Sequence, residues 1–239
     1  MTRRRFIADE VSGDQAALVG DHADHLARVL RARSGEDFDI ATGAAVRRGR
    51  ITSVRGDRVE FELNEVVSAA RLSEITLLLA VFKFDRMEWA IEKCTELGVS
   101  RIVPVIARRT DSHLAAASAK RVERWQRIVK QASEQSRRAT PPEIAAPIKV
   151  GEALSLQAAL RIVLAESEEQ TLLRDVVKPQ TASDEIVLAV GPEGGWTEDE
   201  LQSFHQAGWI SASIGNTILR AETAAIAATA IVASVLHSL

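Results

Sequence analysis

Two glycine-rich stretches near the carboxyl end of the chain combine residue types that can form a ligand site. The first, Gly191 to Trp196, directly follows the apolar run Ile186–Val190. Glycine has no Cβ, so backbone N–H and C=O groups can approach a flat ligand closely, while Pro192 fixes one dihedral angle and stiffens the turn. The second, Gly215 to Arg220, opens with the turn signal Gly-Asn. We therefore expect two binding loops.

Each loop must be held by the elements on either side of it. Ile186–Val190 is apolar and β-branched, which predicts a buried strand, and Thr197 with Glu200 has the pattern of a helix N-cap. Strands and helices alternate through the same part of the chain. The strands are Ile75–Val81, Arg101–Ile106, Arg161–Ala165 and Ser211–Ile214, and the helices are Met87–Leu97, Arg121–Arg137 and Ala224–Leu236. This alternation predicts an α/β fold on a largely parallel sheet.

Two of these helices carry informative faces. In Met87–Leu97 the residues Met87, Ala90, Ile91 and Cys94 share one stripe, so Cys94 is expected to pack as a small hydrophobic residue, and Asp85 with Glu88 resembles a capping pair. The last helix presents a face that can serve either a domain core or a partner helix, made of Ala221, Ala224, Ala225, Ala228, Ile231, Val232 and Val235.

Residues 1 to about 70 have a different pattern. Short runs that alternate polar and apolar residues are separated by glycines, which predicts antiparallel strands in a small barrel or sandwich. Residues 21–33 read as a helix with Leu26, Val29 and Leu30 on one face. The composition shifts at residues 66–73, so we expect one domain at 1–70 and a second at 71–239.

Composition excludes several classes of protein. The single cysteine rules out an intrachain disulfide and a cysteine-rich zinc site, and His22 and His25 lack a third ligand, so we expect no metal. No apolar run reaches the length of a membrane span, and acidic residues follow the first arginines where an export signal needs an apolar segment. We therefore expect a cytoplasmic protein.

Charge is segregated along the chain although the net charge is only −3. From Arg101 to Arg138 there are ten Lys or Arg against three Asp or Glu, and from Arg161 to Phe204 there are three against ten. A basic face that meets phosphate explains this pattern, and so does a solvated helix face.

Four separated motifs carry a family resemblance: the two loops, residues 92–99 (EKCTELGV), residues 134–138 (EQSRR) and the arginine-rich amino terminus. Together they resemble the RsmE-type small-subunit ribosomal RNA methyltransferases of the trefoil-knotted SPOUT superfamily. The resemblance implies an N-terminal PUA-like β-barrel that binds RNA and a C-terminal SPOUT methyltransferase domain that forms a homodimer. It further implies S-adenosyl-L-methionine as cofactor and N3 of one uridine in 16S rRNA of the 30S subunit, uridine 1498, as the methyl acceptor.

The resemblance also assigns residues to sites. It places the cofactor against Leu164, Ala165, Glu166, Gly191, Pro192, Glu193, Gly194, Ile214, Gly215, Asn216, Ile218, Leu219 and Arg220. It implies RNA contacts at Arg3, Arg4, Arg5, Arg28, Arg31, Arg109 and Arg137. One departure is Thr217, which stands where the family often has a basic residue.

Methyl transfer to uracil N3 requires the anion of that ring, and Arg220 can stabilise it as a fixed cation. The other reading of Arg220 is a structural salt bridge with Glu222. Glu193 and Glu222 are candidate general bases, but each can instead hold the cofactor's ammonium group or cap a helix. From a different class, a non-catalytic RNA-binding assembly factor fits the same arginines. A phosphate-binding nucleotide enzyme is disfavoured because the lysine of a P-loop is missing.

Overall fold

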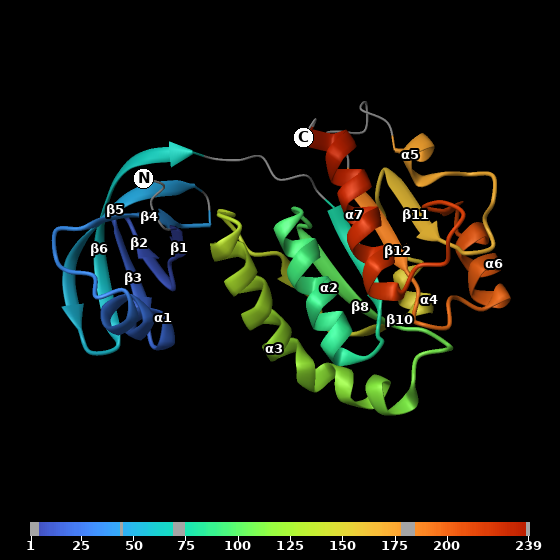
Figure 1. The fold of residues 1–239 in the computed structure, drawn as a ribbon, viewed down its shortest axis with the longest axis horizontal. Helices are drawn as coiled ribbons and strands as arrows, with labels where there is room; N and C mark the ends of the chain where they lie inside the picture. The colour runs from blue at the N-terminus through green and yellow to red at the C-terminus, as the bar shows by residue number, and fades with distance from the viewer. Residues whose placement is uncertain (1–4, 44, 69–74, 178–184, 238–239) are drawn as a thin grey trace. The chain divides into compact units, whose positions relative to one another are not determined.

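The computed structural model describes residues 5–43, 45–68, 75–177 and 185–237, and it divides the chain into two compact units. The N-terminal unit comprises Met1–Arg71 with Ser133–Pro141, and the C-terminal unit comprises Leu72–Ala132 with Pro142–Leu239. Figure 1 shows the elements of both units.

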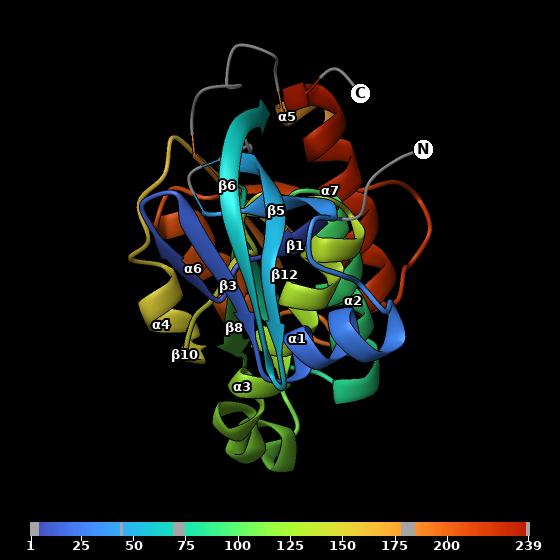
Figure 2. The same cartoon turned by 90° about the vertical axis from the view of Figure 1, so that its left-hand side faces the viewer.

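The N-terminal unit is a six-stranded sheet in the order β1-β4-β5-β6-β3-β2. The strands are β1 (Arg5–Ile7), β2 (Glu10–Ser12), β3 (Gln15–Val19), β4 (Asp37–Ala41), β5 (Val46–Arg55) and β6 (Arg58–Ser68). All pairs are antiparallel except β1 with β4. Within the described residues β1 and β2 are the two ends of this sheet, so the prediction of a barrel is confirmed only in part. Figure 2 shows the two long strands β5 and β6 side by side.

The predicted helix at residues 21–33 is shorter and differently wound. It consists of α1 (Asp21–Asp24) followed by a π-helical stretch, η1 (His25–Val29). The wider turn is closed by the bond from the Leu30 N–H to the His25 carbonyl, at 3.1 Å. Leu26 is buried as predicted, but Val29 is 66% exposed, because the π-turn rotates it away from the face that a 3.6-residue period gives.

The C-terminal unit is built on a seven-stranded sheet in which every pair is parallel, as predicted. The order is β10-β8-β7-β12-β11-β13, and β9 also pairs with β8. The strands are β7 (Ile75–Ala80), β8 (Arg101–Ile106), β9 (Glu143–Ile144), β10 (Ile148–Lys149), β11 (Leu160–Leu164), β12 (Ile186–Val190) and β13 (Ile210–Ala212). β7 and β12 are buried at every residue, as central strands covered on both faces must be.

Helices cover both faces of this sheet. On one face α2 (Phe84–Glu96), α3 (Ser112–Gln135) and α7 (Ala221–His237) share a core with alternate strand residues such as Leu77 and Leu79. On the other, α4 (Val150–Ala153) and α6 (Glu198–Gln206) pack against the intervening residues, such as Leu78. A short helix, α5 (Leu173–Val176), contacts α7. No described helix is long and apolar enough to cross a membrane.

Local predictions for α2 were correct for its face and wrong for its cap. Met87, Ala90, Ile91 and Cys94 are fully buried, and burial raises the pKa of the Cys94 thiol to about 12. The helix begins at Phe84 with Lys83 at the N-cap, so Asp85 lies inside the first turn and caps nothing. Glu88 instead accepts a hydrogen bond from Arg124, 2.8 Å away.

The small-residue face of α7 serves mainly the core of its own unit. Ala221, Ala225, Ala228 and Val232 are buried there, while Ala224, Ile231 and Val235 pack at its margin. Of the two uses that the sequence allowed for this face, the structure shows the domain core.

Candidate functional site

Three neighbouring strands of the C-terminal unit end at one edge of the sheet. β12, β11 and β13 are adjacent and parallel, so their carboxyl ends point the same way. The segments that follow Leu164, Val190 and Ala212 line one cavity of about 650 Å³. The carboxyl edge of a parallel sheet is where α/β proteins bind ligands.

This cavity collects the predicted cofactor residues from three distant parts of the sequence. Twelve of the thirteen line it, namely Leu164, Ala165, Glu166, Gly191, Pro192, Glu193, Gly194, Ile214, Gly215, Asn216, Ile218 and Leu219. Arg220 does not line it: its side chain is exposed, immediately before α7. Ile218 is 81% exposed, so the second loop presents apolar surface outward as well as into the cavity.

The first loop is tightly fixed by its own residues. The Gly195 N–H donates to the Pro192 carbonyl at 2.8 Å, and Gly195 has a φ of 67°, a conformation that favours glycine. A Cβ on Gly191 would lie 3.2 Å from Trp196 Nε1, so a larger residue there would crowd the indole. The N-cap of α6 is confirmed: the Glu200 N–H donates to Thr197 Oγ1, and the Thr197 N–H donates to Glu200 Oε2.

Arg109 adds a clamp on this loop that sequence reasoning missed. Its Nη1 donates to the Gly194 carbonyl at 2.6 Å and to the Trp196 carbonyl at 3.2 Å. The sequence offered no signal for this contact, because Arg109 and Gly194 are separated by 85 residues. The arginine expected to meet RNA therefore holds the wall of the cavity.

The cavity is acidic. Four carboxylates belong to its lining, from Glu166, Glu168, Glu169 and Glu193, against the one guanidinium of Arg109. Hydrogen bonds from the backbone N–H groups of Thr171 and Gln170 lower the pKa of Glu168 and hold its carboxylate in place. This lining suits a cationic ligand and disfavours the phosphate-binding alternative.

Comparison with known proteins agrees with this geometry. A family model described as an RNA methyltransferase domain matches residues 69–233. Ribosomal RNA small subunit methyltransferase E of Synechocystis is 34% identical over 100% of this chain and 79% of its own length. The protein of that name from Rickettsia conorii is 33% identical over 89% and 87%. This chain belongs to the ribosomal RNA small subunit methyltransferase E family.

Two solved structures share the fold over nearly the whole chain. A crystal structure of ribosomal RNA small subunit methyltransferase E from Neisseria gonorrhoeae, bound to S-adenosyl methionine, has a TM-score of 0.84 at 34% identity and covers 96% of each chain. A putative methyltransferase from Legionella pneumophila in complex with the same cofactor has a TM-score of 0.84 at 28% identity, covering 97% of each chain.

The arginines expected to contact RNA in this family member come from both units. Arg3 and Arg4 lie outside the described residues. Arg5, Arg28, Arg31 and Arg137 belong to the N-terminal unit, and Arg109 to the C-terminal unit. Burial lowers the pKa of Arg5, Asp39 opposes that shift and Arg137 adds to it, so these three charges lie near one another. Arg28 pairs with Asp24 at 3.2 Å.

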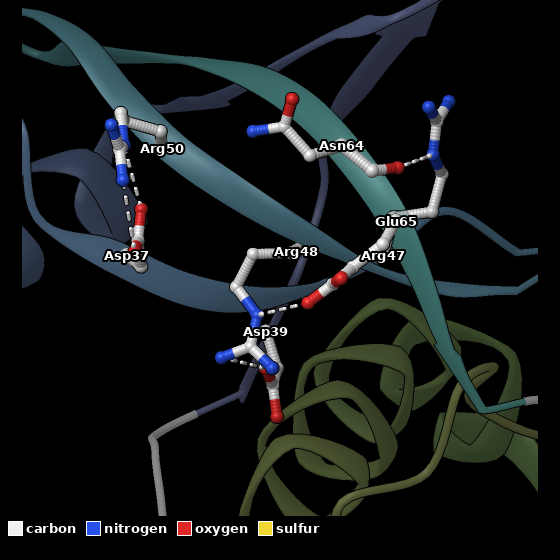
Figure 3. Close-up of polar contacts among 7 residues, drawn as sticks. All are labelled: Asp37, Asp39, Arg47, Arg48, Arg50, Asn64 and Glu65. Carbon is white, nitrogen blue, oxygen red and sulfur yellow. Dashed lines mark hydrogen bonds and ion pairs between the residues drawn. The ribbon is translucent and has the colours of Figure 1, made fainter.

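Other arginines of the sheet are paired with acidic side chains (Figure 3). Arg48 lies between Asp39, at 3.5 Å, and Glu65, at 3.8 Å, and Arg50 pairs with Asp37 at 2.9 Å. Much of the positive charge that the sequence shows in residues 47–50 is thus balanced within the unit. His22 likewise faces carboxylates, and no described group of side chains could hold a metal.

Proposed function

We propose that this chain transfers a methyl group from S-adenosyl-L-methionine to N3 of one specific uridine in 16S rRNA of the small ribosomal subunit. The single observation that carries the proposal is the acidic, glycine-walled cavity at the carboxyl ends of β11, β12 and β13, in a chain that belongs to this family. The choice of cofactor is supported by the similar proteins whose structures contain S-adenosyl methionine.

The lining fits that cofactor chemically. Leu164, Ile214 and Leu219 offer apolar surface for a flat base, and the glycines bring backbone groups within reach of its edge. The lining carboxylates of Glu166, Glu168 and Glu169 match a ligand with a sulfonium and an ammonium group, while Glu193 is already paired with Arg86. The Nε1 of Trp196, a lining residue, is buried and has no hydrogen-bond partner among the described atoms. When bound, the cofactor supplies an activated methyl group with a neutral leaving group.

Arg220 is the proposed catalytic residue. Displacement at a sulfonium needs a nucleophilic acceptor, and the reactive form of uracil N3 is its anion, delocalised onto the carbonyl oxygens. The exposed Arg220 side chain stands at the amino end of α7, where the helix dipole adds positive potential. Among the described residues no contact joins Arg220 to Glu222, which lies beside Arg86 instead, so the salt-bridge alternative has no support.

We assign the remaining features to substrate capture and assembly. The N-terminal unit is the proposed RNA-binding domain of PUA-like type, with contacts at Arg3, Arg4, Arg5, Arg28, Arg31 and Arg137, while Arg109 is proposed to meet RNA from the methyltransferase domain. That domain, at 71–239, is proposed to contain the trefoil knot of the SPOUT superfamily and to form a homodimer. We also propose that the protein is cytoplasmic, because its proposed substrate is ribosomal.

The test separates binding from transfer. Calorimetric titration of S-adenosyl-L-methionine must show a saturable site, and incubation with 30S subunits or with naked 16S rRNA must give 3-methyluridine by mass spectrometry. Arg220→Ala is expected to lower transfer by about 100- to 1,000-fold, the usual loss for one preorganised charge, with cofactor affinity nearly unchanged. Arg174→Ala, another exposed arginine of this unit, is the matched control. Equal loss of both properties in Arg220→Ala contradicts the catalytic assignment. A chain that binds rRNA and no cofactor is instead the assembly factor.

A further inference from the structure

Arg86 contacts two glutamates that come from different elements. It lies in the first turn of α2, and its Nη1 is 2.9 Å from Glu193 Oε1 in the first loop. Its Nε is 3.8 Å from Oε1 of Glu222, the second residue of α7. One guanidinium therefore joins α2, the glycine loop and the start of the last helix. Nothing in the sequence pattern indicated this contact, since Arg86 and Glu193 are 107 residues apart.

Because Glu222 is buried, loss of its contact with Arg86 would be energetically costly. The Glu222 side chain is 5% exposed, and its Oε2 has no hydrogen-bond partner among the described atoms. A buried carboxylate is costly unless a cation compensates it, and Arg86 is the cation that contacts it. Arg86 is therefore held at the amino end of α7 by its Nε, and its Nη1 places a fixed positive charge beside Glu193.

Glu193 links the fixed Arg86 side chain to the cavity wall. It belongs to the cavity lining, and it is the residue directly before Gly194, whose carbonyl Arg109 holds. The first loop is thus anchored through a side chain by Arg86 and through backbone carbonyls by Arg109. Both carboxylates that the sequence offered as general bases contact the same arginine, which favours a structural use of the pair.

We propose that Arg86 is a positioning residue: through Glu193 and Glu222 it sets the spacing between the first loop and the start of α7 and so shapes the cofactor cavity. This inference rests on the proposed function of the cavity as the S-adenosyl-L-methionine site. Arg86 is not among the residues that line the cavity, so it acts on the ligand only through the positions of Glu193 and Glu222. It holds the loop in place and does not read the ligand's charge.

A double-mutant cycle tests the coupling. The variants are Arg86→Gln, Glu193→Gln and the pair, with Arg86→Lys as the conservative replacement. The control is Arg124→Gln, which removes another arginine that contacts α2, through Glu88 at 2.8 Å, but does not reach the loops. Dissociation constants for S-adenosyl-L-methionine and for S-adenosylhomocysteine are measured by calorimetry, and melting temperatures are measured without ligand.

We expect Arg86→Gln to weaken both ligands by about tenfold, within the range of coupled neighbours. Glu193→Gln should have a similar effect, and the double variant should lose little more than the worse single one. Arg86→Lys should recover part of the affinity, and Arg124→Gln should leave it within about twofold. If Arg86→Gln folds poorly, Glu193→Gln still tests the loop half of the contact, because it keeps Arg86 beside Glu222.

Three outcomes overturn the inference. They are unchanged affinity in Arg86→Gln, additive losses in the double variant, or a loss for the sulfonium ligand that spares S-adenosylhomocysteine, which would show a charge effect and no positioning. A wild-type chain that binds neither ligand overturns the proposed function and this inference with it, whereas wild-type binding that survives in Arg86→Gln overturns the inference alone.

Discussion

Replacing Gly191 by alanine tests whether the wall of the cavity depends on the close approach of the Gly191 backbone to the indole ring of Trp196. The new Cβ would lie 3.2 Å from Trp196 Nε1 and 3.3 Å from Cδ1 and Cε2, where ordinary contacts begin at 3.4 Å. The ring cannot move freely, because it packs edge-on against Phe204 at 5.1 Å, and Phe204 packs against Trp209 at 5.0 Å. Either the indole or the loop must shift by a few tenths of an ångström.

The magnitude follows from two opposing effects. Overpacking in a tight site costs about 1–3 kcal/mol, and the lower entropy of the unfolded alanine chain returns about 0.4–1 kcal/mol. The free energy of unfolding should therefore fall by about 0.5–2 kcal/mol, or about 1–8 °C in melting temperature for a unit of this size. If the whole cost arises in the conformation of the first loop that binds the ligand, the affinity for S-adenosyl-L-methionine drops by about 2- to 30-fold.

Urea unfolding and calorimetric titration measure the two effects. The matched control is Gly151→Ala, since a Cβ on Gly151 meets nothing within 4 Å and the residue lies in α4, where alanine is the better helix former. That control should be neutral or slightly stabilising with unchanged affinity. If Gly191→Ala matches Gly151→Ala in both measurements, the loop and ring are not sterically coupled and our reading of the cavity wall is wrong.

Two further predictions concern the surroundings of the site. Thr197→Ala removes the N-cap of α6 and should lower the free energy of unfolding, measured in urea, by about 1 kcal/mol. Thr197→Ser keeps a hydroxyl and should retain most of that free energy. Equal stability of all three proteins would contradict the cap. Cys94 should resist maleimide at pH 8 until the protein unfolds, because burial raises the pKa of its thiol to about 12. The pKa of this thiol in the folded protein lies above its ordinary value of 9.0, so its contribution to the free energy of unfolding is complete below about pH 9 and declines at higher pH. Cys94→Ala should make that decline less steep. Rapid maleimide labelling of the native protein would show that the thiol is not buried.

Sequence patterns predicted what is local. The apolar run at Ile186–Val190 and the Thr197–Glu200 pair required only neighbouring residues, and both were confirmed in β12 and α6. The helix predicted from Arg121 was also found, as α3, although it begins nine residues earlier, at Ser112. Its alanine-rich first turns bury little and so give only a weak hydrophobic period.

Features that depend on tertiary contact were not predictable in this way. The π-turn at His25–Val29 breaks the period on which the face of Val29 was assigned. Arg86 and Arg109 look like any surface arginine in the sequence, and only the folded chain brings them to the first loop. The roles of the cofactor and RNA residues came from family resemblance. The structure gathers twelve of the cofactor residues around one cavity, and their function in binding stays a prediction.

The order in which β11, β12 and β13 occur along the chain has a consequence for biosynthesis. The cavity needs all three strands, and β13 with the second loop is translated after almost every other described element. A nascent chain can therefore build most of the C-terminal sheet while it remains unable to engage the ligand. In the finished protein, a bound ligand stabilises the closed form of the cavity and lowers the population of forms in which β13 and α7 are locally open. A saturating cofactor should therefore protect β13 and α7 from proteolysis more than it protects the N-terminal unit.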